Sequence, residues 1–240
     1  MPGMLNVIGV GPGDPELITL KAARAITASK VIAYFAKRGE RGHARRIADA
    51  LIQPSTEELR LEYPFTTEIP VRDPQYRAGI DAFYAGCIAR IATLLDSGTD
   101  IGLLCEGDPF FYGSCLALID RLGTHRIVVI PGVSGMSGCW TAASVLMTQG
   151  NDVLTVLPAT LGEEALAARL LGTDAVVIMK LGRNLPRVRA ALERSERLAS
   201  AVYVERGTMP DQRIVRMAEL TEATAPYFAL VLVPGRQRWR

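Results

Sequence analysis

The chain has 240 residues, 49% of them hydrophobic and 22% charged, and a formal net charge of +2 at pH 7. This is the profile of an ordinary globular protein, and a charge so close to neutral argues against nucleic acid as a partner. No apolar run is long enough to predict a membrane-spanning helix, and the first residues lack the pattern of a signal peptide.

In the first half of the chain, short apolar runs rich in β-formers alternate with longer helical patterns. Strands are predicted at residues 5–10, 31–35, 101–105 and 127–130, with a weaker candidate at 58–62. Helices are predicted at residues 16–29, 43–52, 74–95 and 112–122. Asp14 and Pro15 supply an N-cap and a first-turn proline for the first of these helices. The alternation predicts βαβ units and a mainly parallel, five-stranded sheet.

The second half repeats this theme less regularly. Strands are predicted at residues 153–157, 175–179, 201–205 and 228–233, with a weaker one at 214–218, and helices at 162–171 and 184–195. The last two strands leave no room for a helix between them, so a mixed sheet with some antiparallel pairing is expected. We place the division of the chain in the loops of residues 131–152. The prediction is two α/β domains, residues 1–132 and 133–240, with a ligand in the cleft between them.

A glycine-rich loop, Gly9-Val10-Gly11-Pro12-Gly13-Asp14-Pro15, follows the first predicted strand. Glycines let a backbone turn sharply and approach a ligand closely. The spacing does not fit the GxGxxG fingerprint, and no acidic residue closes the second strand, where Tyr34-Phe35-Ala36-Lys37 stands. A dinucleotide-dependent oxidoreductase is therefore disfavoured, although this loop alone could be a simple tight turn.

Two further loops follow later predicted strands. Residues 105–114, CEGDPFFYGS, place Gly-Asp-Pro at the carboxyl end of a parallel strand, where open α/β sheets bind their ligands. Asp108 could instead cap the next helix. Residues 131–138, PGVSGMSG, offer small side chains, backbone donors and hydroxyls, or a flexible connector between domains. Two glycine-acid-proline loops in one half of the chain are hard to explain by capping alone, so the loops together predict a ligand site.

Basic residues crowd one short stretch, which contains Lys37, Arg38, Arg41, His43, Arg45 and Arg46. A solvated loop and helix start would explain this cluster, and the alternative is a rim that attracts a polyanionic small molecule.

Cysteines occur at four positions without a CxxC pair, namely Cys87, Cys105, Cys115 and Cys139. The only histidines, His43 and His125, do not lie near a cysteine pair, so no metal site is predicted. Each cysteine has an apolar or helical context, which is typical of reduced core residues in a cytoplasmic protein.

Five segments together resemble the tetrapyrrole methylases, also called class III methyltransferases. They are GVGPGDPELITLKA, EGDPFFYGS, PGVSGMSG, VVIMKLGRN and VERGTMPDQ, which appear in family order and cover essentially the whole chain. The resemblance implies two α/β domains and a homodimer. It also implies S-adenosylmethionine as methyl donor, bound in a folded form in the interdomain cleft and leaving as S-adenosylhomocysteine.

Within the family, the chain most resembles the subfamily that methylates carbon 20 of precorrin-2, or of cobalt-precorrin-2, in cobalamin biosynthesis. The segments concerned are VIAYFAKRGERGHARRIADAL, LRLEYPFTTEIP, VLPATL and the long helix after Arg72-Asp73-Pro74. Gly135 departs from the serine common in the family, which leaves only a backbone contact there, and Phe65 replaces an aliphatic residue.

The sequence leaves other functions open. Another tetrapyrrole methylase, acting on uroporphyrinogen III or a later precorrin, would use the same cofactor loops. A relative of diphthine synthase would leave the subfamily segments unexplained. A non-catalytic binder would hold the cofactor without turnover.

The resemblance assigns cofactor contacts to loop and strand-end residues. They are Pro12, Glu106, Gly107, Asp108, Tyr112, Ser134, Gly135, Met179, Gly207, Thr208 and Ala229. Gly107 would let the backbone pack against the ligand, and Asp108 would accept hydrogen bonds or favour the sulfonium charge. Gly207 and Thr208 would offer backbone amides and a hydroxyl to adenine.

Substrate contacts are predicted from charge. Precorrin-2 carries many carboxylates, and arginine forks match carboxylates better than lysine does. The predicted substrate residues are Arg41, His43, Arg45 and Arg46, with Arg183, Arg187 and Arg189 as alternatives.

The catalytic residue stays open. Methyl transfer to carbon 20 leaves a cationic substrate, which must then lose the proton at that carbon. Glu106, Glu68 and Tyr63 are candidate bases, although the substrate's own carboxylates or water would also serve.

Overall fold

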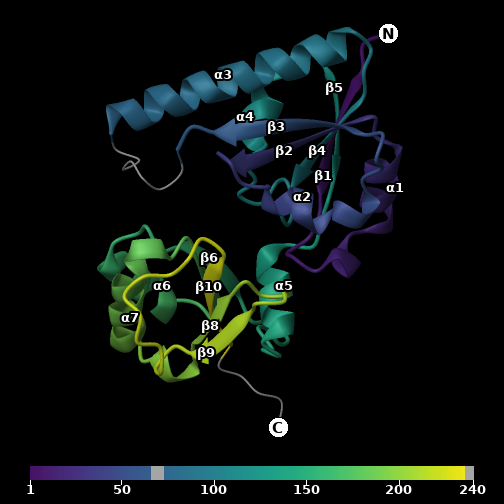
Figure 1. The fold of residues 1–240 in the computed structure, drawn as a ribbon. Coiled ribbons are helices and arrows are strands. Elements are labelled where there is room, and N and C mark those ends of the chain that lie inside the picture. The colour runs from purple at the N-terminus through teal and green to yellow at the C-terminus, as the bar shows by residue number, and fades with distance from the viewer. Residues whose placement is uncertain (66–72, 236–240) are drawn as a thin grey trace. The chain divides into compact units, whose positions relative to one another are not determined.

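A computed structural model describes residues 1–65 and 73–235 of the chain. It divides into two compact units, Met1–Ser134 and Gly135–Arg240. Each unit consists of one five-stranded sheet with helices on both faces (Figure 1). The predicted α/β fold, with a parallel first sheet and a mixed second sheet, is confirmed.

The sheet of the first unit has the strand order β3-β2-β4-β1-β5, and all its pairings are parallel. The strands are β1 (Met4–Gly9), β2 (Val31–Lys37), β3 (Glu57–Tyr63), β4 (Ile101–Cys105) and β5 (Arg126–Ile130). β4 and β1 are nearly continuous apolar runs because helices cover both faces of the central strands. The carboxyl ends of these central strands therefore lie at one edge, which carries the predicted loops.

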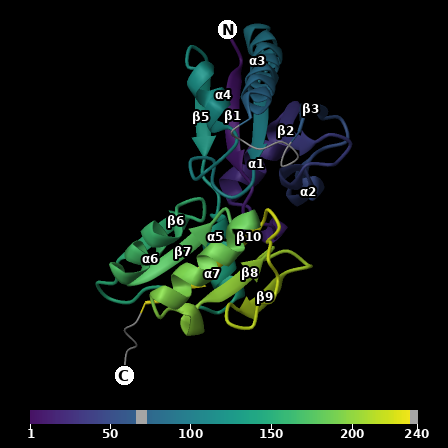
Figure 2. The same cartoon turned by 90° about the vertical axis from the view of Figure 1, so that its left-hand side faces the viewer.

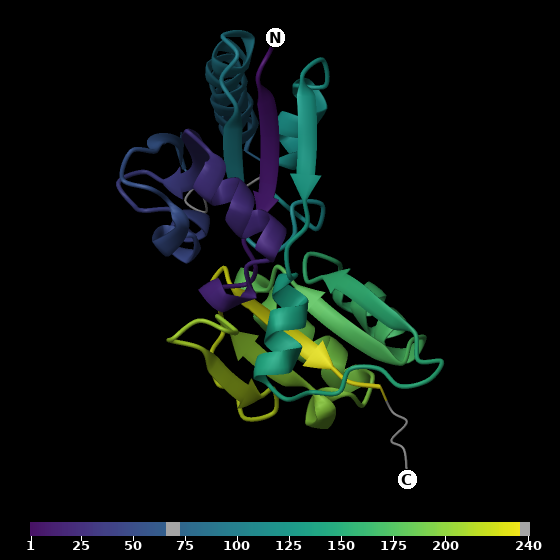
Figure 3. The ribbon, with the colours of Figure 1, turned by 90° about the vertical axis from the view of Figure 1, so that its right-hand side faces the viewer.

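Helices α3 (Pro74–Asp96) and α4 (Leu116–Arg121) cover one face of this sheet (Figure 1). Helices α1 (Leu20–Ala28) and α2 (His43–Ile47) cover the other face (Figure 3). Side chains of a strand alternate between its two faces. Leu103 and Cys105 of β4 consequently pack in the α3 core, whereas Leu104 packs in the α1 core.

The second unit has the strand order β6-β7-β10-β8-β9. Its strands are β6 (Leu154–Pro158), β7 (Ala175–Met179), β8 (Val202–Glu205), β9 (Arg213–Arg216) and β10 (Ala229–Val233). β6 and β7 are parallel, and β10 runs antiparallel to both β7 and β8. Helices α6 (Glu163–Leu171) and α7 (Leu185–Arg194) cover one face (Figure 2), and α5 (Gly135–Ala142) covers the other (Figure 3).

Three predicted helix boundaries were wrong. Asp14 and Pro15 cap a short 3-10 helix, η1 (Pro15–Leu17), and α1 begins later because Thr19 Oγ1 accepts the N–H of Ala22 at 3.2 Å. The helix expected at residues 43–52 ends at Ile47 and is followed by the 3-10 turn η2 (Asp49–Leu51). The helix expected from residue 112 begins only at Leu116, since Tyr112 has a φ of +58° and cannot be helical.

Helix α5 lies where the sequence predicted only loops. Its glycines and serine favour a loop by intrinsic propensity. Cys139 is buried in the core of the second unit, and Met136 and Trp140 pack against the same core. This tertiary packing explains why the segment is helical.

Helix α3 is, among the residues described, the one helix long and apolar enough to cross a membrane by length and composition. A single such helix is weak evidence, because a core helix of a globular protein passes the same test. Cys87, Ile91 and Leu95 of α3 are buried in the core of the first unit. On other faces of the helix, small residues are exposed, including Ala78, Ala82, Ala85 and Ala89.

Candidate functional site

The three glycine-containing loops of the first unit meet at the carboxyl edge of its sheet. Gly107 N donates to Gly11 O at 2.7 Å, and Val10 N donates to Cys105 O at 2.9 Å. A Cβ on Gly9 would lie only 2.6 Å from Gly132 N and 2.7 Å from Gly107 O. The loops are thus in backbone contact, which requires glycine in each of them.

Asp108 holds two of these loops together. Its Oδ1 accepts the N–H of Phe110 at 2.9 Å, and its Oδ2 accepts the N–H of Gly132 at 3.3 Å. Both carboxylate oxygens therefore have backbone partners within the protein. This geometry favours a role in shaping the loops over direct contact with a sulfonium group.

Glu106, two residues earlier, lies at the end of the central strand β4 on the α2 side. Its Oε1 accepts the N–H of Ala44, in the first turn of α2, at 3.1 Å. Burial raises the pKa of the Glu106 carboxyl above its ordinary value, while backbone N–H groups and Arg46 act in the opposite direction. This side chain connects the cofactor loop predicted from the sequence to the helix that carries the basic cluster.

Beyond Glu106, the same loop presents aromatic side chains to solvent. Phe110 is 62% exposed and Tyr112 is 48% exposed. The Tyr112 ring packs edge-on against the Phe111 ring, with 5.0 Å between the ring centroids. Pro12 is buried at the base of the first loop, and Ser134 is partly buried before α5. Exposed rings beside rigid backbone suit a ligand that carries an aromatic base.

In the second unit, the strand register places four predicted cofactor residues at one edge of the sheet. β10 pairs Val231 with Ile178 and Ala229 with Glu205, so the start of β10 lies beside the ends of β7 and β8. The residues brought to this edge are Met179, Gly207, Thr208 and Ala229. Gly135, the first residue of α5, has open space around it, since a Cβ there would meet no atom within 4 Å.

The Gly207–Thr208 turn is tightly held within the second unit. A Cβ on Gly207 would lie 2.7 Å from Cys139 Sγ, and Thr208, with a φ of +72°, donates its N–H to Gln212 Oε1 at 3.0 Å. The buried carboxylate of Glu205, just before the turn, accepts the Tyr203 hydroxyl at 3.0 Å and pairs with Arg206. A turn fixed in this way can present its backbone groups to a ligand without reordering.

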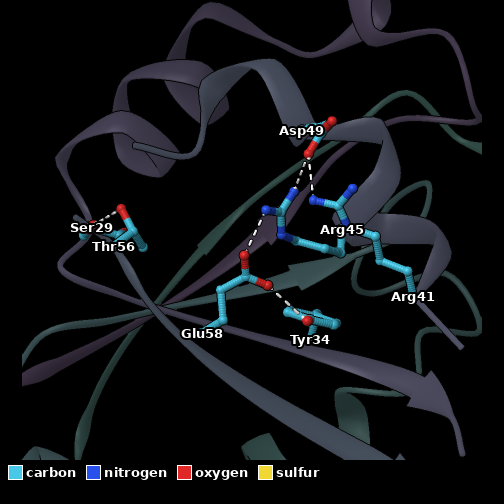
Figure 4. A network of polar contacts seen from close by, with 7 residues as sticks. All are labelled: Ser29, Tyr34, Arg41, Arg45, Asp49, Thr56 and Glu58. Atoms are coloured by element: carbon cyan, nitrogen blue, oxygen red, sulfur yellow. Dashed lines mark hydrogen bonds and ion pairs between the residues drawn. The ribbon is translucent and has the colours of Figure 1, made fainter. Parts of the chain in front are cut away.

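Arg45 does not lie on an open rim. Only 5% exposed, it pairs with Asp49 at 2.7 Å and with Glu58 at 2.6 Å (Figure 4). Tyr34 donates to the other Glu58 oxygen at 2.8 Å, and Arg41 also pairs with Asp49 at 2.7 Å. The hydrogen bond from Arg45 holds the pKa of Glu58 below its ordinary value. Arg45 therefore connects α2 to the edge strand β3, and its two terminal nitrogens are occupied by carboxylates.

The other basic residues predicted from the sequence are more available. Arg46 is exposed and lies 2.6 Å from the His43 ring, measured from Nη2 to Nδ1. Arg41 is exposed and lines an open polar depression of about 770 Å³. Arg60 of β3, which was not predicted from the sequence, lines the same depression. The period-two alternation of β3 could have indicated it, since Arg60 and Glu58 share a face.

The alternative arginines of the second unit have mainly structural partners. Arg189 donates to the carbonyl oxygens of Met217 and Leu220, and Arg187 donates to Leu161 O at 3.2 Å. Arg183 is exposed.

The three candidate bases occupy different environments. Glu68 lies outside the described residues. Tyr63 is on the α3 side of the first sheet. Its ring stacks on the Phe35 ring with 5.4 Å between the ring centroids, and its hydroxyl oxygen lies 3.4 Å from the hydroxyl oxygen of Tyr84. Of the two described candidates, Glu106 alone lies in one of the glycine loops.

Metal-ligand clusters of three or more His, Cys, Asp or Glu side chains do not occur in the part of the chain that the structure describes. All four cysteines are buried as free thiols.

The loops at the edge of the parallel sheet lie within the region that matches one methylase family. A profile of tetrapyrrole (corrin/porphyrin) methylases matches residues 4–223, which is most of the chain. The protein belongs to this family, and the resemblance seen in the sequence is confirmed.

Two curated relatives cover nearly the full length. The chain is 49% identical to precorrin-2 C(20)-methyltransferase from Sinorhizobium sp. over 234 residues, which cover 97% of this chain and 96% of the relative. It is 25% identical to cobalt-precorrin-2 C(20)-methyltransferase from Salmonella typhimurium, covering 97% of both. Uroporphyrin III C-methyl transferase from Thermus thermophilus has the same fold, with a TM-score of 0.65, 22% identity and coverage of 97% of both chains.

Proposed function

We propose that the protein transfers a methyl group from S-adenosylmethionine to carbon 20 of precorrin-2 or of cobalt-precorrin-2, in cobalamin biosynthesis. The observation that carries this proposal is the 49% identity, over 97% of the chain, to a precorrin-2 C(20)-methyltransferase. Most of the segments that resemble that subfamily belong to β2, α2, β3 and α3 of the first unit, and VLPATL lies at β6 of the second unit.

The described residues fit S-adenosylmethionine as methyl donor. The loops of Gly11, Gly107 and Gly132 form a rigid backbone surface next to exposed aromatic rings. Gly207 and Thr208 present a fixed turn at the edge of the second sheet. We propose that the loops of the first unit and the turn of the second unit each contribute contacts to the cofactor. The sulfonium methyl is already electrophilic, so the protein has chiefly to align it with the nucleophilic carbon.

Pro12, Tyr112, Ser134, Gly135, Met179 and Ala229 complete the proposed cofactor site, together with Asp108, whereas Glu106 borders the site without binding the cofactor. Asp108 acts there through the loops that it ties together. For the substrate, we propose that Arg41, Arg46, His43 and Arg60 receive the peripheral carboxylates. Arg45 does not bind the substrate, because its guanidinium already pairs with Glu58 and Asp49, and it holds α2 against β3 instead.

The protein functions as a cytoplasmic homodimer, without nucleic acid or membrane as a partner. Family resemblance supports the dimer, and so does the exposed row of alanines on α3, since small side chains allow a second copy to approach closely.

The test is methyl transfer from labelled S-adenosylmethionine, with precorrin-2 and cobalt-precorrin-2 offered in parallel. The expected product gains one methyl group, which NMR places at carbon 20, and the preferred substrate distinguishes the aerobic from the anaerobic route. Measurable cofactor binding without transfer to either substrate would refute the proposal and point to another tetrapyrrole.

A further inference from the structure

Glu106 is a carboxylate held without a cationic partner in hydrogen-bond contact. Among the residues that the structure describes, its donors are two backbone N–H groups, its own and that of Ala44. Arg46 acts on it only through its charge. The residue as a whole is only partly buried. It is therefore both fixed in position and able to take up a proton.

Other carboxylates near the carboxyl edge of the first sheet have structural tasks. Asp108 uses both oxygens for backbone N–H groups. Asp14 caps η1 by accepting the N–H of Glu16 at 2.9 Å. Glu62 pairs with Arg60 at 3.1 Å. Protonating Asp108 would weaken a contact between two loops, and protonating Glu62 would remove an ion pair, whereas a protonated Glu106 keeps an oxygen that can accept the Ala44 N–H and loses no ion pair.

We propose that Glu106 is the proton acceptor of the methylation, taking the hydrogen of carbon 20 after the methyl group has been transferred. This inference rests on the proposed function and adds the residue that completes the reaction. In the first step the new C–C bond forms at carbon 20 and the S–CH₃ bond breaks, its electron pair remaining on sulfur. The methylated macrocycle is then cationic and still carries the hydrogen at carbon 20. In the second step the C–H electron pair returns to the macrocycle and the proton goes to the Glu106 carboxylate.

The position of Glu106 suits this transfer. It adjoins Gly107, in the loop proposed for the methyl donor, and its carboxylate binds the first turn of α2, which carries His43 and Arg46. It is therefore placed where the proposed cofactor and substrate surfaces of the first unit meet.

The pH dependence follows from the groups around the carboxylate. Burial raises the pKa of Glu106, and Arg46 on α2 opposes this effect. The thiols of Cys105 on β4 and Cys115 before α4 are close enough to interact with its charge. A base must be deprotonated to act, so product formation should fall as the pH decreases through this raised pKa. The acid limb should therefore lie at higher pH than for an ordinary glutamate.

The decisive variant is Glu106→Gln in the full-length chain. Glutamine keeps an oxygen that can accept the Ala44 N–H, so α2 should remain in place. In a single turnover we expect S-adenosylhomocysteine to form almost as fast as in the wild type, while deprotonated product forms at least about 100-fold more slowly. With substrate deuterated at carbon 20, the isotope effect on product formation should be larger than in the wild type. The acid limb of the pH profile should disappear.

Two further variants separate this role from a structural one. Glu106→Asp retains a carboxylate and should keep an acid limb at reduced rate. Glu164→Gln, which alters an exposed residue on α6, should behave like the wild type. S-adenosylmethionine affinity, measured by calorimetry, should change by less than about threefold in all three variants.

Either of two results would overturn the assignment. One is a Glu106→Gln variant that forms product at the wild-type rate. The other is a variant that loses S-adenosylhomocysteine formation and product to the same extent, which would make Glu106 a cofactor or positioning residue. If the wild type itself places no methyl group on carbon 20, the proposed function fails and this assignment fails with it.

Discussion

The contact between the three glycine loops gives a prediction at Gly132. In a Gly132→Ala variant, the new Cβ would collide with the carbonyl oxygen of Gly107, and it would lie 2.9 Å from the Gly9 carbonyl carbon and 3.0 Å from its Cα. All of these atoms are backbone, so no flexible side chain can move away. The loops must separate, which also weakens the hydrogen bond from Gly132 N to Asp108 Oδ2.

The expected cost follows from these contacts. Overpacking a well-packed site costs typically about 1–3 kcal/mol, and a collision with two separate loop backbones places Gly132→Ala near the upper end, at about 3 kcal/mol. For a chain of this size, each kcal/mol corresponds to roughly 2–4 °C in Tm. We therefore expect the melting temperature to fall by roughly 6–12 °C, and the affinity for S-adenosylmethionine to fall with it.

The matched control is Gly135→Ala, three residues further along the chain. A Cβ there would meet nothing within 4 Å, and the residue begins a helix, where alanine is favoured over glycine. This variant should melt within about 2 °C of the wild type, as expected for a substitution worth under 1 kcal/mol. Calorimetry on both variants tests the reasoning. Equal melting temperatures for Gly132→Ala and the wild type would show that the loops are not in close backbone contact.

Three further predictions concern other parts of the molecule. Arg45→Met should lower the free energy of unfolding by roughly 2 kcal/mol at pH 7, which is less than for a fully buried ion pair because Asp49 is exposed. The control variant Arg46→Met should have little effect. Equal losses of stability for the two variants in urea titrations would argue against the buried network. The Arg45 bond lowers the pKa of Glu58 from 4.5, so its stabilisation is complete above about pH 4.5 and disappears as the pH falls through the lowered value. The stability difference between the wild type and Arg45→Met should therefore shrink in acid, and a constant difference down to pH 3 would contradict this. If the proposed homodimer forms through this face of α3, Ala85→Arg should give a folded monomer in light scattering, while Ala85→Ser leaves the dimer intact. An unchanged dimer would exclude this face of α3.

The order of strands and helices could be predicted from the sequence because parallel strands that are buried on both faces are continuous apolar runs, as in β4. It failed for α5, where the signal lies in packing partners distant in sequence. The Gly-Ser composition of that segment favours a loop, and only the core around Cys139 and Trp140 stabilises the helix. Local propensity contains no information about that core.

The basic cluster shows the same limit at the level of single side chains. The pairing of Arg45 with Asp49 is visible in the sequence as an i,i+4 spacing. The pairing with Glu58 depends on how β3 pairs with β2, where Tyr34 lies opposite Arg60. Without that register, all arginines of the stretch look equally suited to bind carboxylates. The structure separates the buried Arg45 from the exposed Arg41 and Arg46.

Glu106 and Asp108 lie on either side of one glycine, yet their surroundings suit them to different tasks. Asp108 accepts two backbone N–H groups from two different loops, so its charge is needed for the loops to hold together. Glu106 extends to the α2 side, where burial favours its protonated form, and it has no ion pair to lose. Replacing each carboxylate by its amide should therefore have different consequences at the two positions. Asp108→Asn should weaken both stability and cofactor affinity, because an amide cannot accept from both donors. Glu106→Gln should leave both nearly intact and slow only the step that needs a base. Parallel losses in the two variants would show that the EGD segment acts as a single structural unit.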